Sequence, residues 1–389
     1  MSVTAPKGFV ASGVAAGLKA GGRADVALVA TDDGRAVPAA AVFTANLAAA
    51  APVQVSRRHL AESGGRVAAV VLSAGNANAA TGEAGVAAAE RLCALVAEGL
   101  GARAEEVLIG QTGLIGIPFP LQLAEAAVGP LLSARADGTA SGAAAATAIM
   151  TTDTVAKEVV VQGDGFVVGG MAKGAAMLAP NMATMLAVLT TDAQVDADDL
   201  GPILAAAVGP SFNAMTVDGC TSTNDTVVLL ASGRAGAAPR EAFAEAVGEA
   251  TRHLAEAMAA DAEGATKVVH VAVSGARSDE EAHRAARKVA DSLLVKCSFN
   301  GADPYFGRVL SELGTAGVAF DLDRAQVAYG GIVVCDKGVA VDHDGPAVAA
   351  HMAGRQIELA CELGLGSGSS VVLTTDLGYG YIDENRTTS

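Results

Sequence analysis

A threonine at the entrance to an apolar strand is the first residue of this sequence that could act as a nucleophile. Thr184 follows Pro180 and Ala183 and precedes the run Met185–Leu189, which is apolar at every position. Such a run predicts a short strand buried on both faces, and the proline predicts a bend before it. A hydroxyl held where a tight loop enters a rigid strand suits nucleophilic chemistry. Taken alone, the pattern also fits an ordinary β-forming threonine whose hydroxyl binds a nearby backbone group.

Lys173 and Glu263 are charged residues whose neighbours predict a fixed position. Lys173 lies in the segment G-G-M-A-K-G, where burying an ammonium group without a partner is costly. We therefore expect it to face a pocket that receives a carboxylate. Glu263 precedes Gly264 at a predicted helix end, which would hold its carboxylate in place. A solvated helix-end carboxylate fits the same pattern.

Three polar segments could build the rest of a site. Gly110–Gly116, with the sequence G-Q-T-G-L-I-G, predicts a turn whose backbone N–H groups stabilise developing negative charge. It lacks the phosphate-loop pattern and runs into Pro118. Thr151–Asp153 fits an ordinary Asx or ST turn. The cluster from Asp218 to Asp225 is dense enough in polar atoms to form a hydrogen-bonded loop network, for which a structural role is the simpler interpretation.

Hydrophobic patterns predict the strands and helices that position these residues. Val67–Leu72 and Val107–Ile109 are apolar runs that predict buried strands. Val159–Val161 and Phe166–Val168 predict a hairpin that leads to Lys173. The sequence also predicts two long helices and a later apolar strand, over the ranges Glu83–Leu100, Arg240–Ala260 and Gln326–Cys335.

Taken together, these motifs resemble those of the glutamate N-acetyltransferases, also called ornithine acetyltransferases, a family of arginine biosynthesis. The stretch from Lys173 to Thr184, K-G-A-A-M-L-A-P-N-M-A-T, is similar to the family's self-cleavage motif. The family also carries T-T-D-T, here at residues 151–154, and G-N-A-N, here at residues 75–78. The motifs follow the family's order over essentially the whole chain. The combination is therefore specific, although each motif alone is weak.

The resemblance implies an α/β fold, an αββα sandwich similar to that of N-terminal-nucleophile enzymes. A smaller α/β domain is expected at about residues 268–370. The resemblance also implies autocatalytic cleavage of the bond between Ala183 and Thr184. The products would be an alpha chain of residues 1–183, with the main sandwich domain, and a beta chain of residues 184–389 that completes it. Two copies of each chain are expected to form a heterotetramer.

The implied activity moves the acetyl group of N-acetylornithine to glutamate through an acetyl-Thr184 intermediate. In the family the residues that match Thr112 and Gly113 form the oxyanion hole, and the match of Thr151 contacts substrate. Lys173 is the expected partner of the substrates' α-carboxylate, and Glu263 that of ornithine's cationic end. No cofactor is expected. Acetyl-CoA as a second acetyl donor is left open, because no loop that would bind it can be identified.

The C-terminal tail completes the implied pocket. Asn385 matches the family's asparagine, which precedes a short tail that reaches into the active site. The tail of this chain lacks the usual aromatic residue and is about one residue short. Ser389 is the expected substrate contact, with Thr388 as the alternative.

Composition excludes several other classes of function. The formal net charge of −16 would repel phosphate backbones and anionic membranes, so no nucleic-acid partner is expected. Five scattered cysteines without a C-x-x-C pair suit a reduced compartment, and the histidines form no zinc motif. No signal peptide or bilayer-spanning apolar run is evident, so a cytoplasmic protein without a membrane partner is expected.

Two alternatives remain at the level of sequence. A self-processing aminopeptidase or amidohydrolase of the same fold would admit water to the acyl-enzyme. A non-catalytic metabolite-binding protein would keep Thr184 as a strand residue in an uncut chain. The full set of transferase motifs favours the acetyltransferase over both.

Overall fold

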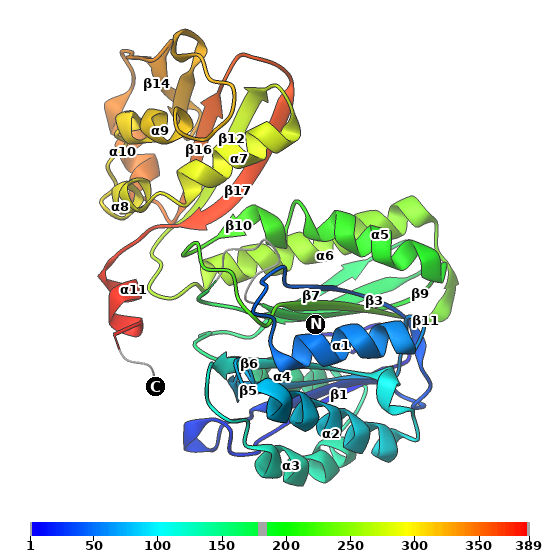
Figure 1. Ribbon diagram of the computed structural model, residues 1–389. Helices are drawn as coiled ribbons and strands as arrows, with labels where there is room; N and C mark the ends of the chain where they lie inside the picture. The colour runs from blue at the N-terminus through cyan, green and yellow to red at the C-terminus, as the bar shows by residue number, and fades with distance from the viewer. Residues whose placement is uncertain (1, 178–184, 387–389) are drawn as a thin grey trace. The chain divides into compact units, whose positions relative to one another are not determined.

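The computed structural model of the chain describes residues 2–177 and 185–386 (Figure 1). The predicted cleavage site, Ala183 and Thr184, lies outside the described residues. The same holds for Ser389 and Thr388, the two candidates for the terminal substrate contact.

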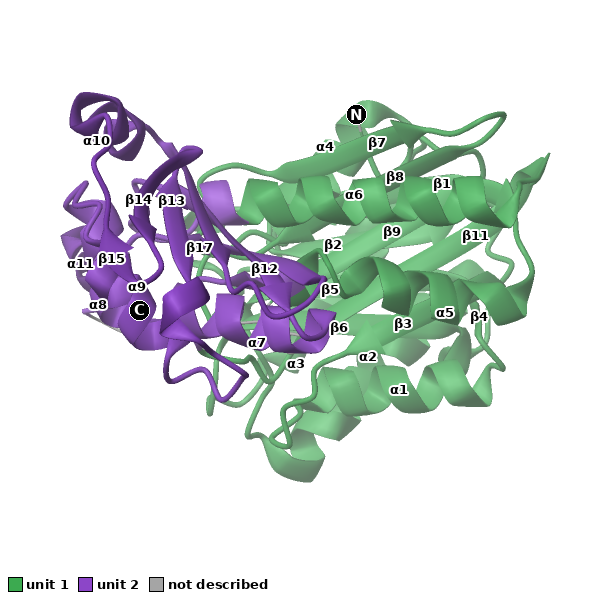
Figure 2. Cartoon of the chain, turned by 90° about the horizontal axis from the view of Figure 1, so that it is seen from above, with its two compact units in different colours: residues 1–213, 220–258 green, residues 214–219, 259–389 purple. Residues whose placement is uncertain are grey.

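The chain forms two compact units, which Figure 2 colours separately. Unit 1 comprises Met1–Asn213 and Cys220–Met258, and unit 2 comprises Ala214–Gly219 and Ala259–Ser389. The smaller domain expected at about residues 268–370 falls within the sequence range of unit 2. The division into chains of residues 1–183 and 184–389 concerns cleavage and stays a prediction.

The first sheet of unit 1 has four strands, in the order β1-β2-β5-β6. Their bounds are β1 Phe9–Val14, β2 Val26–Thr31, β5 Ala69–Asn76 and β6 Val107–Leu114. β1, β2 and β5 are antiparallel neighbours, whereas β5 and β6 are parallel. Small apolar residues line both faces of these strands, because the sheet is covered on both sides.

The second sheet of unit 1 has six strands, in the order β4-β3-β11-β9-β8-β7. Their bounds are β3 Val37–Phe43, β4 Arg66–Val67, β7 Lys157–Gln162, β8 Val167–Lys173, β9 Leu186–Gln194 and β11 Thr226–Ala237. β7 and β8 form the predicted antiparallel hairpin. β9 is buried at every position from Leu186 to Ala193, which confirms a strand with two covered faces after Thr184. It runs antiparallel to β8 and parallel to β11.

Helices cover the outer faces of both sheets of unit 1 (Figure 1). The helices described in unit 1 are α1 Ala51–Glu62, α2 Gly82–Leu100, α3 Leu121–Ser133, α4 Thr139–Ala148, α5 Ala197–Val208 and α6 Arg240–Ala260. α2 and α3 pack on the four-stranded sheet, whereas α5 and α6 cover the six-stranded one. α4 adds Ala145, Ala146 and Ala148 to the apolar core between the sheets. The predicted α/β class with an αββα sandwich is confirmed.

Unit 2 contains a seven-stranded sheet, in the order β10-β17-β12-β16-β13-β14-β15. Its strands are β10 Met215–Thr216, β12 Val268–Ala276, β13 Gln326–Tyr329, β14 Ile332–Asp336, β15 Val339–Ala340, β16 Gln356–Glu362 and β17 Gly368–Thr375. Its helices are α7 Asp279–Ala290, α8 Leu293–Asn300, α9 Phe306–Leu313, α10 Gly345–Ala353 and α11 Tyr379–Glu384. Among residues 2–177 and 185–386, no helix has the length and apolar character that crossing a membrane requires.

One predicted strand of unit 2 is a hairpin instead. The range Gln326–Cys335 was expected to form one strand, but β13 and β14 pair with each other in antiparallel register. Gly330 and Gly331 both have positive φ, at 57° and 79°. Two such residues in succession make the tight turn that joins short antiparallel strands. The residues on both sides of these two glycines are apolar, so the hydrophobic pattern does not indicate the turn.

Candidate functional site

Thr112 and Gly113 lie on strand β6 and not in the glycine-rich turn that the sequence predicts. β6 continues to Leu114 because it pairs with β5, and the register slips at Gly75 and Asn76. Gly113 has φ +130°, and a Cβ there would lie 2.3 Å from the carbonyl carbon of Gly75. Only glycine fits this close approach of two backbones. The two glycines therefore allow β5 and β6 to stay paired beyond Thr112, which lies on the edge strand of this sheet.

Lys173 is the last residue of β8 and contacts Thr112 directly. Its Nζ donates a hydrogen bond to Thr112 Oγ1 over 3.2 Å, although the two residues are 61 positions apart. The Lys173 and Thr112 side chains are both buried. In the sheet, Lys173 is paired with Leu186, which follows Thr184 by two residues. The structure thus brings together two of the predicted site residues beside the strand that follows the predicted nucleophile.

Asp153 joins the Thr151 turn to this pair. Its carboxylate accepts hydrogen bonds from the Thr151 amide at 3.0 Å and the Gly174 amide at 2.8 Å. It also forms a 2.6 Å ion pair with Lys157, and both of these side chains are buried. Gly174 follows Lys173 directly, so one carboxylate ties the Thr151 turn to the end of β8. The sequence indicated only an ordinary Asx or ST turn at this place.

The charges around Asp153 set its protonation. Burial alone would raise the pKa of Asp153, but the charges of Lys173 and Lys157, with hydrogen bonds from Lys157 and Thr151, hold it well below the usual range. Asp153 is therefore ionised at neutral pH. Two buried lysines thus lie close to one ionised carboxylate, in a chain whose net charge is −16.

Buried amide side chains form hydrogen bonds with β6 at Gln111, the residue before Thr112. Asn78 Nδ2 donates to Gln111 Oε1 over 2.8 Å, and Asn224 Nδ2 donates to the Gln111 carbonyl over 2.9 Å. Asn224 Nδ2 also binds the Ala77 carbonyl at 2.6 Å. Gln111 precedes Thr112, so this network fixes the strand at the point where the Thr112 hydroxyl projects. The G-N-A-N motif and the polar cluster after residue 218 thus meet at β6.

Asp225 holds the start of β9, a role that sequence reasoning missed. The Met185 amide donates to Asp225 Oδ1 over 2.6 Å, and the Thr226 amide donates to the Met185 carbonyl over 3.1 Å. Asp225 is only 1% exposed, and its second oxygen has no hydrogen-bond partner among the described residues. Burial raises its pKa well above the usual range. Both polar backbone groups of the residue after Thr184 are therefore anchored.

Glu263 and Asn385 meet within unit 2. Asn385 Nδ2 donates to Glu263 Oε2 over 2.7 Å and to the Tyr381 carbonyl over 2.9 Å. Gly264 has φ +63°, and a Cβ there would lie 2.1 Å from the Tyr381 nitrogen. This glycine lets α11 approach the segment that carries Glu263. The predicted site residues that the structure describes therefore form two groups, one in each unit.

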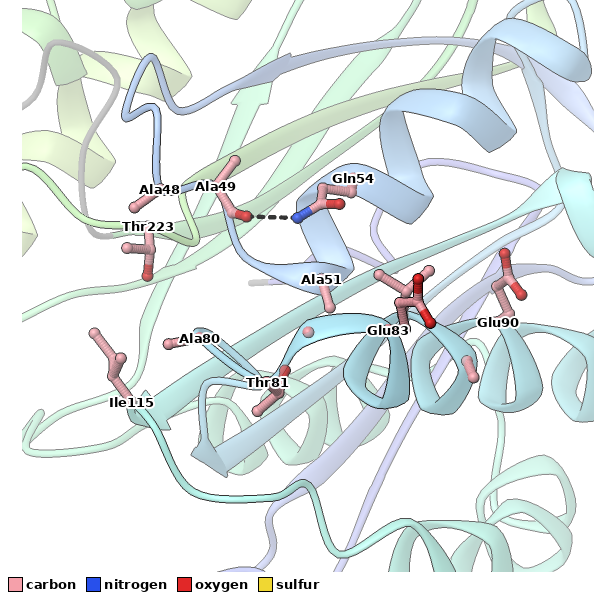
Figure 3. A pocket seen from close by; sticks show the side chains of 13 residues that line it. Ala48, Ala49, Ala51, Gln54, Ala80, Thr81, Glu83, Glu90, Ile115 and Thr223 are labelled. Carbon is pink, nitrogen blue, oxygen red and sulfur yellow. Dashed lines mark hydrogen bonds between the residues drawn. The ribbon is translucent and has the colours of Figure 1, made fainter.

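A pocket of about 640 Å³ lies in unit 1 at the first turns of α1 and α2 (Figure 3). Its lining combines small apolar residues with Gln54, Glu83 and Glu90. Gln54 Nε2 donates to the Ala49 carbonyl over 2.8 Å. None of the predicted site residues that the structure describes lines this pocket. In the part of the chain that the structure describes, no group of three or more His, Cys, Asp and Glu side chains could hold a metal ion.

The αββα sandwich and the buried Lys173–Thr112 pair fit the class of α/β-sandwich enzymes. Residues 10–387 match the ArgJ family, and the chain belongs to that family. The resemblance to the glutamate N-acetyltransferases, and with it an enzyme of arginine biosynthesis, is confirmed.

The relatives match over nearly their full length. The chain is 46% identical over 388 residues to the arginine biosynthesis bifunctional protein ArgJ of Thermobifida fusca, with 99% of each chain covered. It is 45% identical over 387 residues to the protein of the same name from Streptomyces avermitilis, again with 99% covered.

Two solved structures are also similar to parts of the chain. A Bacillus halodurans ArgJ chain has a TM-score of 0.49 and 33% identity, covering 51% of this chain and 96% of that one. A Mycobacterium tuberculosis ornithine acetyltransferase chain, complexed with ornithine, has a TM-score of 0.42 and 40% identity, covering 47% of this chain and 95% of that one.

Proposed function

We propose that this protein transfers the acetyl group of N-acetylornithine to glutamate through an acetyl ester on Thr184. The observation that carries the proposal is the hydrogen bond from Lys173 to Thr112. It links a buried cation to the proposed oxyanion residue, at the end of the strand that pairs with the segment after Thr184. Membership of the ArgJ family supports the same activity.

Self-cleavage prepares the nucleophile. Thr184 Oγ attacks the carbonyl carbon of Ala183, the peptide bond between them breaks, and the acyl group passes to the oxygen. Water then hydrolyses this ester, which leaves a carboxylate on Ala183 and a free α-amine on Thr184. An α-amine has an ordinary pKa of about 7.7–8.0, so a fraction is neutral at working pH. It accepts the proton of its own hydroxyl, and no separate histidine base is required.

Acetyl transfer then proceeds in two half-reactions. Thr184 Oγ attacks the acetyl carbonyl of N-acetylornithine, and ornithine leaves with the proton returned by the α-amine. The amine of glutamate attacks the resulting ester, which gives N-acetylglutamate and restores the hydroxyl. In both tetrahedral intermediates Thr112 and Gly113 donate to the oxyanion. Loss of one such donor costs on the order of 3–4 kcal/mol of barrier in other enzymes.

The charges of the two residue groups match the ends of the substrates. Both amino acids carry an α-carboxylate, for which Lys173 is the proposed partner, and Asp153 ties Thr151 to Gly174, the residue after Lys173. Ornithine adds a side-chain ammonium, for which Glu263 is the proposed partner. Asn385 binds Glu263 and orients it. Ser389 is the proposed contact from the tail.

Three further features belong to the proposal. The cut chains of residues 1–183 and 184–389 assemble as a heterotetramer with two copies of each. The reaction requires no cofactor and takes place in the cytoplasm. Acetyl-CoA serves as a second acetyl donor to glutamate, a possibility that the word bifunctional in the relatives' names supports.

The test combines protein chemistry with product analysis. Active protein should run as two fragments that together account for 38.3 kDa, the second beginning at Thr184. Incubation with N-acetylornithine alone should add one acetyl group to that fragment. Thr184→Ala should stay a single chain without transfer, whereas Thr190→Ala, which removes a buried hydroxyl further along β9, should still be cut. Active protein with only its original N-terminus would refute self-cleavage. Release of acetate without N-acetylglutamate would indicate the hydrolase instead.

A further inference from the structure

The segment before Lys19 is fixed by a single buried carboxylate. Asp25 is fully buried. Its side chain accepts the amide hydrogens of Ala16, Gly17, Leu18 and Lys19, at distances from 2.6 to 3.0 Å. Four charge-assisted bonds to one side chain hold the loop between β1 and β2 in one conformation. The Lys19 side chain therefore leaves from a rigid backbone.

The ammonium of Lys19 binds the peptide that leads into Thr151. Its Nζ donates to the Ala148 carbonyl at 3.1 Å and to the Met150 carbonyl at 3.0 Å. Ala148 is the last residue of α4, where carbonyls lack partners within the helix and a positive charge is favourable. Met150 directly precedes Thr151. Lys19 thus caps the helix and fixes the start of the Thr151 turn.

The stem of Lys19 packs against the strand pair that carries the oxyanion residues. A Cβ at Gly75 would lie 3.2 Å from Lys19 Cγ, and Gly75 is the register partner of Gly113. One side chain therefore bridges the Gly75–Gly113 pair and the Thr151 turn.

Lys19 adds positive charge where charge is already crowded. Burial lowers the pKa of its ammonium, and the charges of Arg23 and Lys173 lower it further, against the opposing effects of Asp25 and Asp153. A simple helix cap gains nothing from a neighbouring cation. A site that receives a carboxylate does, because a bound anion is attracted by both lysines.

We propose that Lys19 is a positioning residue of the acetyl-transfer site, which holds the Thr151 turn against the Gly75–Gly113 pair and adds positive charge for the substrate's carboxylate. The contribution to substrate binding rests on the proposed function. The contribution to positioning does not, because it concerns only the contacts of Lys19 with Ala148, Met150 and Gly75.

Unit 2 provides a matched control. Lys267 Nζ donates to the Ala353 carbonyl at 2.9 Å and the Gly354 carbonyl at 2.8 Å. It caps the end of α10 as Lys19 caps α4, and both side chains are partly buried. Lys267→Met removes the same pair of bonds away from the Thr151 turn. Comparison with this variant distinguishes the effect of losing a helix cap from the effect of displacing the Thr151 turn.

The experiment compares Lys19→Met, Lys19→Gln, Lys19→Arg and Lys267→Met. Lys19→Met should raise KM for both glutamate and N-acetylornithine roughly tenfold or more, as expected for a lost charge-assisted hydrogen bond. Lys19→Arg, which keeps the charge and the donors, should recover most of the loss. Lys19→Gln keeps a donor without the charge and serves if the methionine variant does not fold. Lys267→Met should lower thermal stability and leave both KM values unchanged.

Amide hydrogen exchange tests the positioning without relying on activity. Exchange of the Thr151 and Asp153 amides should speed up in Lys19→Met and Lys19→Gln but not in Lys267→Met. If exchange and KM in the Lys19 variants match those of Lys267→Met, Lys19 is only a helix cap and the proposal is wrong. If wild-type protein transfers no acetyl group while exchange at Thr151 depends on Lys19, the proposed function fails and the positioning role stands.

Discussion

A lysine in each unit of this protein is buried to the same degree, and these two lysines have different surroundings. Lys173 in unit 1 and Lys296 in unit 2 are both 3% exposed. Lys296 Nζ donates to Thr374 Oγ1 at 2.8 Å and to the carbonyl and hydroxyl of Thr375 at 2.6 and 3.2 Å. Three acceptors match the three hydrogens of an ammonium group. Burial lowers the pKa of Lys296 to about 8.

Lys173 is surrounded by groups that a reaction can use. It contacts the hydroxyl of Thr112, and its charge, with that of Lys157, holds the pKa of Asp153 low. The partners of Lys296 lie on β17 and continue the packing of its sheet. Burial of a lysine therefore does not by itself indicate function. The two sites differ in the kind of neighbour: Lys296 binds three uncharged acceptors on one strand, whereas Lys173 lies near an ionised carboxylate and contacts the proposed oxyanion residue.

Substitution of Asp153 should have the largest effect on the difference between the Lys173 and Lys296 sites. Asp153→Asn removes the carboxylate that pairs with buried Lys157 and interacts with Lys173, which should destabilise unit 1 by about 3–5 kcal/mol. Denaturant unfolding measures the change. Asp192→Asn is the control, because Asp192 is also buried and accepts the amides of Lys7 and Val167. Equal losses in the two variants would show that the lysines around Asp153 are not what makes it essential.

The pH dependence of the same variant has a defined sign. The folded pKa of Asp153 is lowered, so its stabilising effect is complete above the ordinary pKa of an aspartate, about 3.9, and is lost as pH falls below it. The difference in stability between wild type and Asp153→Asn should shrink over that acidic range. A difference that stays constant down to the acid limit contradicts the assignment.

Substitution of the two lysines tests the comparison itself. Lys173→Met should lower the efficiency of acetyl transfer by roughly 10- to 150-fold, because a charge-assisted hydrogen bond is worth about 1.5–3 kcal/mol. Self-cleavage involves no free carboxylate and should suffer less. Lys296→Met should destabilise unit 2 and leave kcat/KM close to wild type. If Lys173→Met folds but stays uncleaved, Lys173 belongs to the cleavage chemistry and its assignment to the substrate is wrong.

The smallest expected effect is the alkaline response of unit 2. The folded pKa of Lys296 is about 8, below its ordinary value of 10.5. Unfolding therefore takes up a proton between these pH values, and the stability of unit 2 should rise with pH there by about 1.4 kcal/mol per pH unit. Below about pH 8 the contribution is constant. Thermal melts of wild type and Lys296→Met across this range isolate the effect, and parallel curves for the two proteins would count against it.

Sequence patterns located elements but not the contacts between them. β9, α6 and the β7–β8 hairpin follow from local runs of apolar residues, so their positions could be predicted closely. The extension of β6 through Gly113 could not, because it depends on pairing with β5. The contacts of Lys19 with Ala148 and of Asp225 with Met185 join residues 129 and 40 positions apart. No short window of sequence contains both partners, so only the family resemblance indicated that distant motifs belong to one site.

The strand order of the six-stranded sheet has a consequence for the lifetime of the cut protein. β9 and β11 follow the proposed cut, yet they lie between β8 and β3, which precede it. A severed chain would thus be held together on both sides by strand pairing, over Val168–Lys173 on one side and Ala39–Phe43 on the other. Once such fragments separate, reassembly becomes bimolecular, and each fragment exposes unpaired sheet edges that invite aggregation. In an uncut precursor the peptide bond keeps the two halves of the chain together during folding. A cut protein would stay assembled only until its six-stranded sheet opens. The half-life of the cut protein is therefore set by the rate at which the sheet unfolds and not by an equilibrium with free fragments.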